Sequence, residues 1–379
     1  MIDIGEVTSD MIYFAVGKYN LAGGAVITAS HNPGAYNGIK LCREEARPIG
    51  LESGLSEIRD NCLSGSFLSS SKTGETSQKD VIEDWIDHVM SFIDADSLKP
   101  LRIAVDAGNG MAGKIFPEIE PYLPFEVTEM YFELDGTFPN HEANPLKFET
   151  LADMIKVIKD EKLDAGVAFD GDGDRAFLVD EKGEVLTGGV MSAMLSEYFL
   201  RRHSGSNIIY DARNSRSVPN VIQKAGGKPV RTRVGHALMK AAMRESNAPF
   251  GGEASGHFYF RDNWYADSGL IAAIIGLYIL SRSGKKLSQL REKYTHYAAI
   301  PETNFITKNK DKILTQIEST FKNATIDRLD GITLTFNDGW MNIRSSNTEP
   351  LLRLNAEADT KDKLDKYVYK VKKIIESNA

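Results

Sequence analysis

An apolar segment, Ala165–Phe169, runs directly into a loop in which three aspartates alternate with glycines, Asp170-Gly171-Asp172-Gly173-Asp174-Arg175. Five consecutive apolar or small residues are typical of a strand buried on both faces, as in a sheet covered by helices. The glycines let the loop curl, so that alternate side chains converge on one point. Because α/β proteins build their sites at the carboxyl ends of such strands, this segment predicts an α/β fold with a functional loop.

The three carboxylates of this loop predict a metal site. Carboxylates cannot lie close together without a compensating charge, because their mutual repulsion raises their pKa values. A divalent cation removes that cost, and an all-oxygen ligand set with few protein donors favours Mg²⁺. We therefore expect Asp170, Asp172 and Asp174 to hold Mg²⁺, with an acidic surface turn as the alternative. Arg175 and the apolar Ala176-Phe177-Leu178 break the ligand pattern of an EF-hand.

A serine turn near the start of the chain supplies a candidate nucleophile. The segment Thr28-Ala29-Ser30-His31-Asn32-Pro33 follows Ala25–Thr28, which we expect to be a short buried strand. His31 and Asn32 can donate hydrogen bonds to a phosphate beside the Ser30 hydroxyl. A serine on a turn is more commonly a capping residue, so this motif gains its meaning only from the other segments.

Two further polar segments complete the set. Arg344-Ser345-Ser346-Asn347-Thr348 groups a guanidinium, hydroxyls and an amide, as a phosphate clamp would, although a polar hairpin turn has the same composition. Glu253, Ser255 and His257 follow a glycine-rich turn at Gly251–Gly252 and suit sugar hydroxyls, with an ordinary turn as the alternative. A nucleophile, a hard-metal cage and an anion grip together predict phosphate transfer, because few reactions need all three.

One motif favours a different chemistry. Gly108-Asn109-Gly110-Met111-Ala112-Gly113 has the spacing of a dinucleotide-binding fingerprint, follows the predicted strand Arg102–Asp106 and precedes Glu133 by twenty residues. A nicotinamide-dependent dehydrogenase is therefore an alternative. It would leave the aspartate loop and the serine turn without a role.

The length of 379 residues is too great for one core, and strands alternate with helices over most of it. We predict α/β units at residues 1–97, 98–203 and 204–300, the first of them thin in strands, and a C-terminal α+β unit at residues 301–379. The longest apolar run, Leu270–Leu280, is too short to span a membrane and predicts a buried helix capped by Asp267 or Ser268 and ended by Gly284.

Composition excludes several partners. The net charge of −8 argues against nucleic-acid binding, which normally requires a basic face. Cys42 and Cys62 are too few for a disulfide framework or a zinc site, and the first residues lack the basic start and apolar run of a signal peptide. We therefore expect a cytoplasmic protein with small-molecule substrates, no membrane contact and an oligomeric state that the sequence does not define.

The four motifs, in this order and at this spacing, resemble the α-D-phosphohexomutase family over essentially the whole chain. The segments Tyr36–Arg43, Phe138–Pro145 and Phe258–Asp262 are most similar to its bacterial phosphomannomutases. The resemblance implies three similar α/β domains around a central cleft and a C-terminal α+β domain. Family members carry roughly one more half-domain before this point, so the resemblance predicts that the first domain is incomplete.

The resemblance also implies roles for individual residues. Ser30 would be the phosphoserine and would complete the Mg²⁺ shell of the three aspartates, with Lys40 and Arg175 flanking the transferring group. Substrate contacts would come from His31, Asn32, Arg213 (where Lys is usual), His236, Glu253, Ser255, Arg344, Ser346, Asn347 and Thr348.

The implied reaction interconverts mannose 6-phosphate and mannose 1-phosphate through a hexose 1,6-bisphosphate, which serves as intermediate and activator. Lys40 and His257 are both candidates for the general base, and the sequence does not choose between them. Phosphoglucomutase activity, phosphoglucosamine mutase activity and an inactive truncated protein that binds sugar phosphates are the alternatives.

Overall fold

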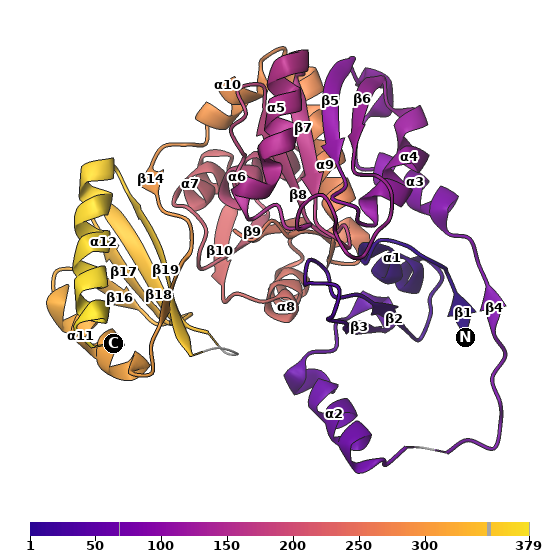
Figure 1. Ribbon diagram of the computed structural model, residues 1–379, viewed down its shortest axis with the longest axis horizontal. Helices are drawn as coiled ribbons and strands as arrows, with labels where there is room; N and C mark the ends of the chain where they lie inside the picture. The colour runs from indigo at the N-terminus through magenta and orange to yellow at the C-terminus, as the bar shows by residue number, and fades with distance from the viewer. Residues whose placement is uncertain (68, 347–349, 379) are drawn as a thin grey trace.

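A mixed sheet carries the aspartate loop in the structure, a computed structural model that describes residues 1–67, 69–346 and 350–378 (Figure 1). Its strand order is β6-β5-β7-β8, with β5 parallel to β6 and β7, and β8 antiparallel to β7. All residues of β7 and β8 are buried, which confirms the predicted buried strand before the loop. The elements are β5 (Leu101–Asp106), α4 (Ala112–Ile119), β6 (Phe125–Met130), α5 (Ala152–Glu161), β7 (Ala165–Phe169) and β8 (Ala176–Asp180).

A second mixed sheet, ordered β10-β9-β11-β12-β13, carries the loop of Glu253 and His257 between β11 and β12. The prediction of a turn at Gly251–Gly252 is wrong, because both glycines belong to the buried strand β11. A Cβ on Gly251 would lie 2.7 Å from the Met243 sulfur, so the glycine lets a helix pack closely on the strand. The elements are β9 (Asn207–Asp211), α7 (Ser217–Lys224), β10 (Lys228–Thr232), α8 (His236–Ser246), β11 (Phe250–Gly252), β12 (Phe258–Phe260) and β13 (Ala266–Asp267).

Two long buried helices, α6 (Gly188–Arg202) and α9 (Gly269–Ser283), contact each other and share one hydrophobic core with both sheets. The predicted limits of α9 are confirmed: the Ser268 hydroxyl accepts a hydrogen bond from the Ile271 amide at 3.1 Å, and Gly284 adopts φ +64°. Among the described residues, no helix combines the length and the apolar character needed to cross a membrane.

The first part of the chain holds the serine turn in a two-stranded ribbon of β2 and β3. The expectation that Ala25–Thr28 is a buried strand is wrong: Ile27 on β2 is 72% exposed, and its partner Ile39 on β3 is 62% exposed. The ribbon packs only one side on α1, where a Cβ on Gly24 would lie 2.8 Å from Ile12, so alternate residues remain in solvent. The elements are β1 (Ile2–Asp3), which pairs with β4 (Ser77–Gln78), α1 (Asp10–Lys18), β2 (Gly23–Ile27), β3 (Ile39–Arg43), α2 (Leu55–Ser64) and α3 (Ile82–Met90).

The last part of the chain forms a separate core of sheet and helices, drawn in orange and yellow in Figure 1. Its strand order is β14-β19-β18-β17-β16, and β15 also pairs with β19. The antiparallel pairing confirms the predicted grouping of strands. The elements are β14 (Ala298–Ala299), β15 (Thr303–Ile306), α11 (Lys310–Thr320), β16 (Thr325–Asp327), β17 (Ile332–Phe336), β18 (Gly339–Ser345), β19 (Leu351–Ala358) and α12 (Lys361–Glu376). The short helix α10 (Leu287–Glu292) precedes them and packs on the first core through Leu287 and Leu290.

The loop with dinucleotide spacing does connect a strand, β5, to a helix, α4, but its glycines face protein. A Cβ on Gly110 would lie 2.6 Å from the Gly171 carbonyl oxygen, and the Met111 amide donates a hydrogen bond to that oxygen at 2.9 Å. The start of α4 therefore supports the backbone of the aspartate loop, which accounts for the glycine spacing without a dinucleotide.

Stability should depend on pH through the His141–Asp106 pair at the end of β5. The His141 Nε2 lies 3.1 Å from the buried Asp106 carboxylate, and this hydrogen bond raises the pKa of His141. A histidine whose pKa is raised by folding stabilises the folded state fully at pH values below the ordinary histidine pKa. This stabilisation is lost as the pH rises through the pKa that His141 has in the folded protein. Chemical denaturation of His141→Gln should show a loss of about 1 kcal/mol at pH 5.5 and almost none at pH 8.5. The exposed His296→Gln is the control, and an equal loss at both pH values would contradict the pair's role.

Candidate active site

The serine turn lies directly against the aspartate loop. Ser30 adopts φ +51°, and its amide donates a hydrogen bond to the Thr28 hydroxyl at 2.8 Å. Its own hydroxyl lies 3.0 Å from the Asp170 Oδ2. Gly171 permits this approach, because a Cβ there would overlap the Ser30 carbonyl oxygen. The predicted nucleophile and the predicted metal loop are therefore in contact.

The three aspartates converge as the sequence predicts. One carboxylate oxygen from each of Asp170, Asp172 and Asp174 lies within 4.8 Å of the others, and all three residues are buried. The Lys40 ammonium, from β3, lies 2.6 Å from Asp172 Oδ2 and 2.5 Å from Asp174 Oδ2. Arg175 donates from Nε to Asp170 Oδ2 at 2.7 Å. Lys40 and Arg175 thus bring two positive charges to the three carboxylates.

The carboxylate oxygens fit a divalent cation. Asp172 Oδ1 and Asp174 Oδ1 are buried and accept no hydrogen bond from the described residues, and an unpaired buried carboxylate oxygen is costly. Oxygen ligands from three carboxylates suit Mg²⁺. Asp170, Asp172 and Asp174 are therefore the residues that would hold it, with the Ser30 hydroxyl beside them.

Burial and charge shift the pKa values of this cluster in opposite directions. Burial raises the pKa of Asp170 to about 6, against the lowering effect of Arg175. Burial also acts on Asp174, but Lys40 and His257 outweigh it and hold the pKa of that carboxyl well below its usual range. Burial would lower the pKa of Lys40, yet Asp174 and Asp172 raise it well above its usual value. Lys40 is therefore a fixed cation in this arrangement.

His31 joins the serine turn to Arg175. The Ser30 Oγ lies 3.0 Å from His31 Nδ1, and the Arg175 guanidinium donates to the same nitrogen. Burial, and then the Arg175 charge, lower the pKa of His31 to about 4, so its ring is neutral. Asn32 instead folds back, because its side-chain amide donates to the Ala29 carbonyl at 2.8 Å.

The loop between β11 and β12 adjoins the aspartate loop through a backbone bridge between Arg175 and His257. The Ser255 hydroxyl donates to Glu253 Oε2 at 2.8 Å, and His257 Nδ1 lies 3.5 Å from the same oxygen. On its other side, His257 Nε2 lies 3.5 Å from Asp174 Oδ1. His257 thus connects the predicted sugar-binding loop to the predicted metal site.

His257 carries a proton in this setting. Burial would lower its pKa, but Asp174 and Glu253 outweigh burial and raise it to about 9. Both candidates for the general base, Lys40 and His257, are therefore cations here, and either must lose its proton before it can act as a base.

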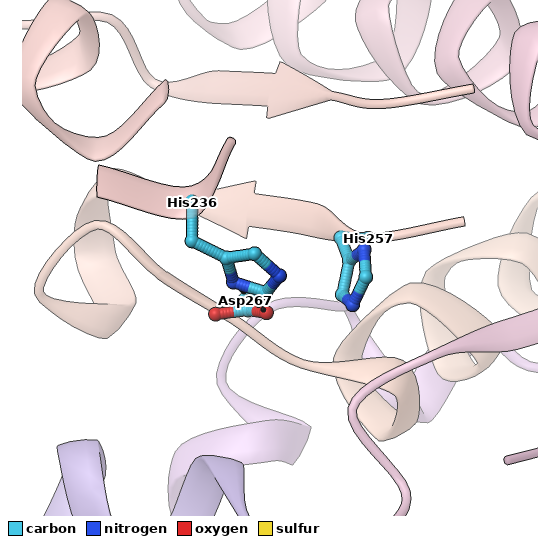
Figure 2. A group of neighbouring side chains, drawn as sticks. All are labelled: His236, His257 and Asp267. Atoms are coloured by element: carbon cyan, nitrogen blue, oxygen red, sulfur yellow. Dashed lines mark ion pairs between the residues drawn. The ribbon is translucent and has the colours of Figure 1, made fainter. Parts of the chain in front are cut away.

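His236 stands beside His257 at the start of α8 (Figure 2). The two rings are 4.2 Å apart at their centroids, and His236 Nδ1 lies 3.2 Å from Asp267 Oδ2. The ammonium of Lys240, 1% exposed, lies 2.9 Å from the other oxygen of Asp267 and 3.9 Å from the centre of the Tyr13 ring. The structure thus brings the predicted His236 to the same site and adds a buried ion pair beneath it.

Arg213 and Arg344 meet at a shared carboxylate. Arg344 Nη2 lies 3.0 Å from Glu302 Oε2, and Arg213 Nη1 lies 3.9 Å from the same oxygen. Arg213 also pairs with Asp211 at 2.6 Å and donates to the Ser255 hydroxyl at 3.3 Å. The predicted clamp is therefore joined to the sugar-binding loop, and the described residues show no hydrogen bond between Arg344 and Ser30.

A cavity of about 430 Å³ opens near this junction, lined by residues of the second and third predicted α/β units and of the C-terminal unit. Arg213 and Ser255 line one side, and Glu302 and Asn355 line the other. Ser346 is buried, and its amide donates to the Leu351 carbonyl at 3.0 Å. Asn347 and Thr348 lie outside the described residues.

Several site residues escaped the sequence analysis. The Ser9 hydroxyl donates to Asp174 Oδ2 at 3.3 Å and accepts a hydrogen bond from Lys40 at 3.1 Å. The Thr28 hydroxyl donates to Asp172 Oδ2 at 2.9 Å. Glu302 and Asp267 are isolated acidic residues without a motif. Only Thr28, inside the serine motif, carried a signal that could have identified it.

The models of one protein family match almost the whole chain. Family models described as phosphoglucomutase/phosphomannomutase alpha/beta/alpha domains I, II and III match residues 1–68, 83–183 and 187–297, and the C-terminal domain model matches residues 302–374. The chain belongs to the phosphoglucomutase/phosphomannomutase family. It is therefore a phosphohexomutase, an isomerase, as the resemblance implied. The predicted limits of residues 1–97, 98–203, 204–300 and 301–379 stay predictions.

Individual relatives agree with this assignment. A phosphomannomutase of Vibrio cholerae is 38% identical over 99% of this chain and 84% of its own length. A phosphomannomutase of Escherichia coli is 38% identical over 94% of this chain and 81% of its own length. The crystal structure of a phosphoglucomutase/phosphomannomutase family protein from Burkholderia thailandensis has a TM-score of 0.89 at 30% identity and covers 100% of this chain and 82% of that one.

Removing one charge from the aspartate cage should weaken metal binding. Asp172→Asn leaves the side-chain size almost unchanged but reduces the negative charge that attracts a hard cation. Calorimetry with Mg²⁺ should show at least about a tenfold loss of affinity. The exposed Asp96→Asn is the matched control and should bind as the original protein does. Equal affinity in both variants, or full turnover in excess chelator, would contradict the metal site.

Proposed function

We propose that this phosphohexomutase interconverts mannose 6-phosphate and mannose 1-phosphate, with Ser30 as the residue that carries the transferred phosphoryl group. The contact between the Ser30 hydroxyl and Asp170 at 3.0 Å is the observation that carries the proposal. This contact joins the Ser30 hydroxyl to a cluster of three buried carboxylates that also contains Lys40 and Arg175, which supports its role as the nucleophile. The phosphomannomutase relatives support mannose as the sugar.

The charges of the cluster suit a phosphoserine. Bound Mg²⁺ would supply positive charge that offsets the carboxylates and the charge on a transferring phosphoryl group. The Lys40 ammonium stays protonated and can balance the equatorial oxygens of that group. The neutral His31 ring and the Arg175 guanidinium flank the hydroxyl and can orient it.

The cavity beside the sugar-binding loop can hold the substrate in either direction. Glu253, Ser255 and His257 offer hydrogen bonds to sugar hydroxyls. Arg213 and Arg344, held together by Glu302, offer two guanidiniums to the phosphate that is not reacting. One clamp and one phosphoserine would serve both ends of a hexose 1,6-bisphosphate if that intermediate turns round between the two transfers.

Two solved structures of similar fold support this substrate class. An N-acetylphosphoglucosamine mutase of Aspergillus fumigatus is described in complex with GlcNAc-6P and magnesium, and a serine-to-alanine variant of it in complex with glucose 1,6-bisphosphate. Their identity to this chain is only 14%, so they support the fold and make a bisphosphate and Mg²⁺ reasonable candidates here. A coupled assay on mannose 1-phosphate, with a trace of hexose 1,6-bisphosphate, tests the activity, and parallel assays on glucose 1-phosphate and glucosamine 1-phosphate test the sugar. The choice of base between Lys40 and His257, and a cytoplasmic location, stay predictions.

Loss of the serine hydroxyl should abolish transfer without unfolding the protein. Ser30→Ala removes the attacking oxygen, and turnover should fall at least about 10³-fold. Peptide mapping after incubation with labelled hexose bisphosphate should find label on the original protein and none on the variant. The exposed Ser69→Ala is the control. Label on another residue, with activity retained in Ser30→Ala, would contradict the assignment.

Replacing the guanidinium of the clamp should reduce substrate affinity. Arg344→Lys keeps the charge but loses the planar fork that binds a phosphate through two hydrogen bonds. We expect KM to rise roughly tenfold for both mannose 1-phosphate and mannose 6-phosphate, because the clamp would hold whichever phosphate is not transferred. The same change at Arg328, which pairs with Glu318 on the surface, is the control. Unchanged kinetics with both substrates would exclude the clamp.

A further inference from the structure

A second cavity, of about 550 Å³, lies between the carboxyl-terminal ends of α6 and α9 and is bounded by α10. It is separate from the candidate active site. The helix α9 begins at Gly269, where a Cβ would lie 2.6 Å from the Gly173 carbonyl of the aspartate loop, and it ends at Ser283 in this cavity. Fifteen residues of α-helix span about 22 Å. Figure 1 shows α10 at the opposite end of the α/β layers from β2 and β3.

Five cations line this cavity: Arg201, Arg202, Arg282, Lys285 and Lys293. No carboxylate lines it among the described residues. Such a local concentration of positive charge is unexpected in a protein with a net charge of −8. It is costly unless an anion or nearby acid compensates it.

Nearby groups account for only part of this charge. Glu197 lies 2.8 Å from Arg201 and also contacts Lys293, so it compensates about one cation. Arg202 donates to the Phe92 carbonyl at 2.7 Å, and Arg282 donates to the Ser97 carbonyl at 3.1 Å, but neutral carbonyls leave the charges in place.

The helix ends explain some of these cations and not others. Arg201, Arg202 and Arg282 stand in the last turns of α6 and α9, where the helix dipole favours positive charge. Lys285 and Lys293 belong to neither helix, yet they line the same cavity. The dipole alone therefore does not account for the cluster.

The rest of the lining is apolar and aromatic except for Ser283. It consists of Tyr198, Tyr278, Tyr294, Ile279 and Leu290, and the Tyr198 and Tyr278 rings meet edge to face at 5.9 Å. A sugar ring needs hydrogen-bonding side chains of the kind that Glu253 and His257 provide, whereas a flat base packs on aliphatic and aromatic groups. A cavity with an apolar floor and a basic rim therefore suits an anion that also carries an aromatic ring.

We propose that this cavity binds a nucleoside polyphosphate, with the base against Tyr278, Ile279 and Leu290 and the phosphates at Arg201, Arg282 and Lys285. Its volume lies within the range of small-molecule sites. The inference rests on the lining of this cavity and is independent of the reaction proposed for Ser30.

Calorimetry with ADP as the probe, on the full chain at fixed ionic strength, tests the proposal. ADP should bind with one site per chain, more tightly than inorganic diphosphate or adenosine, because only ADP carries both ring and charge. An excess of mannose 6-phosphate should leave the binding unchanged, since the two sites lie at opposite ends of α9. Lys285→Glu should weaken ADP binding on the order of tenfold, because it replaces attraction by repulsion. The exposed Lys372→Glu on α12 makes the same charge change outside the cavity and should bind as the original protein does.

Three results would overturn the proposal. The first is the absence of ADP binding at millimolar concentration. The second is equal affinity for ADP and inorganic diphosphate, which would show that the ring is not recognised. The third is evidence that ADP binds elsewhere, given either by equal weakening through Lys285→Glu and Lys372→Glu or by displacement of ADP with mannose 6-phosphate. Thermal unfolding of both variants in the absence of ADP verifies that each is folded.

Discussion

The compensation of three buried carboxylates is the interaction on which the rest of the site depends. Asp170, Asp172 and Asp174 can lie within one cage only because cations reach them from other parts of the chain. Lys40 lies on β3, His257 lies in the loop between β11 and β12, and Arg175 directly follows Asp174. The charge requirement thus connects three units that are far apart in the sequence.

Close backbone approach is the second requirement, and glycines meet it. Gly171 lies against the Ser30 carbonyl, Gly110 lies against Gly171, and Gly269 begins α9 against the Gly173 carbonyl. A side chain at any of these positions would push apart the segments that carry Ser30, the three aspartates and the supporting helices. The glycine spacing that suggests a dinucleotide fold therefore serves the packing of the aspartate loop.

Burial divides the titratable groups of the site into distinct roles. The Lys40 and His257 side chains remain cations because adjacent carboxylates outweigh the cost of burial. His31 faces the Arg175 charge instead and stays neutral. Desolvation lowers the pKa of all three groups, and the neighbouring charge decides which protonation state each group adopts.

Sequence alone determined the local elements and the motifs of this protein. Local patterns correctly predicted the buried strand before Asp170. They also predicted the helix α9, which is capped at Ser268 and ends at Gly284. Local patterns also misled: Gly251 and Gly252 suggested a turn but lie in β11, because a helix packs against the strand there.

Only the tertiary structure decided which groups meet. Ser9 and Glu302 belong to no sequence motif, yet Ser9 contacts Asp174 and Glu302 joins Arg213 to Arg344. The exposure of Ile27 likewise follows from the single layer that packs on its ribbon. A residue's type fixes its charge and its hydrogen-bonding atoms, whereas its partners depend on chain segments more than a hundred residues away, and that information appears only when those segments are folded together.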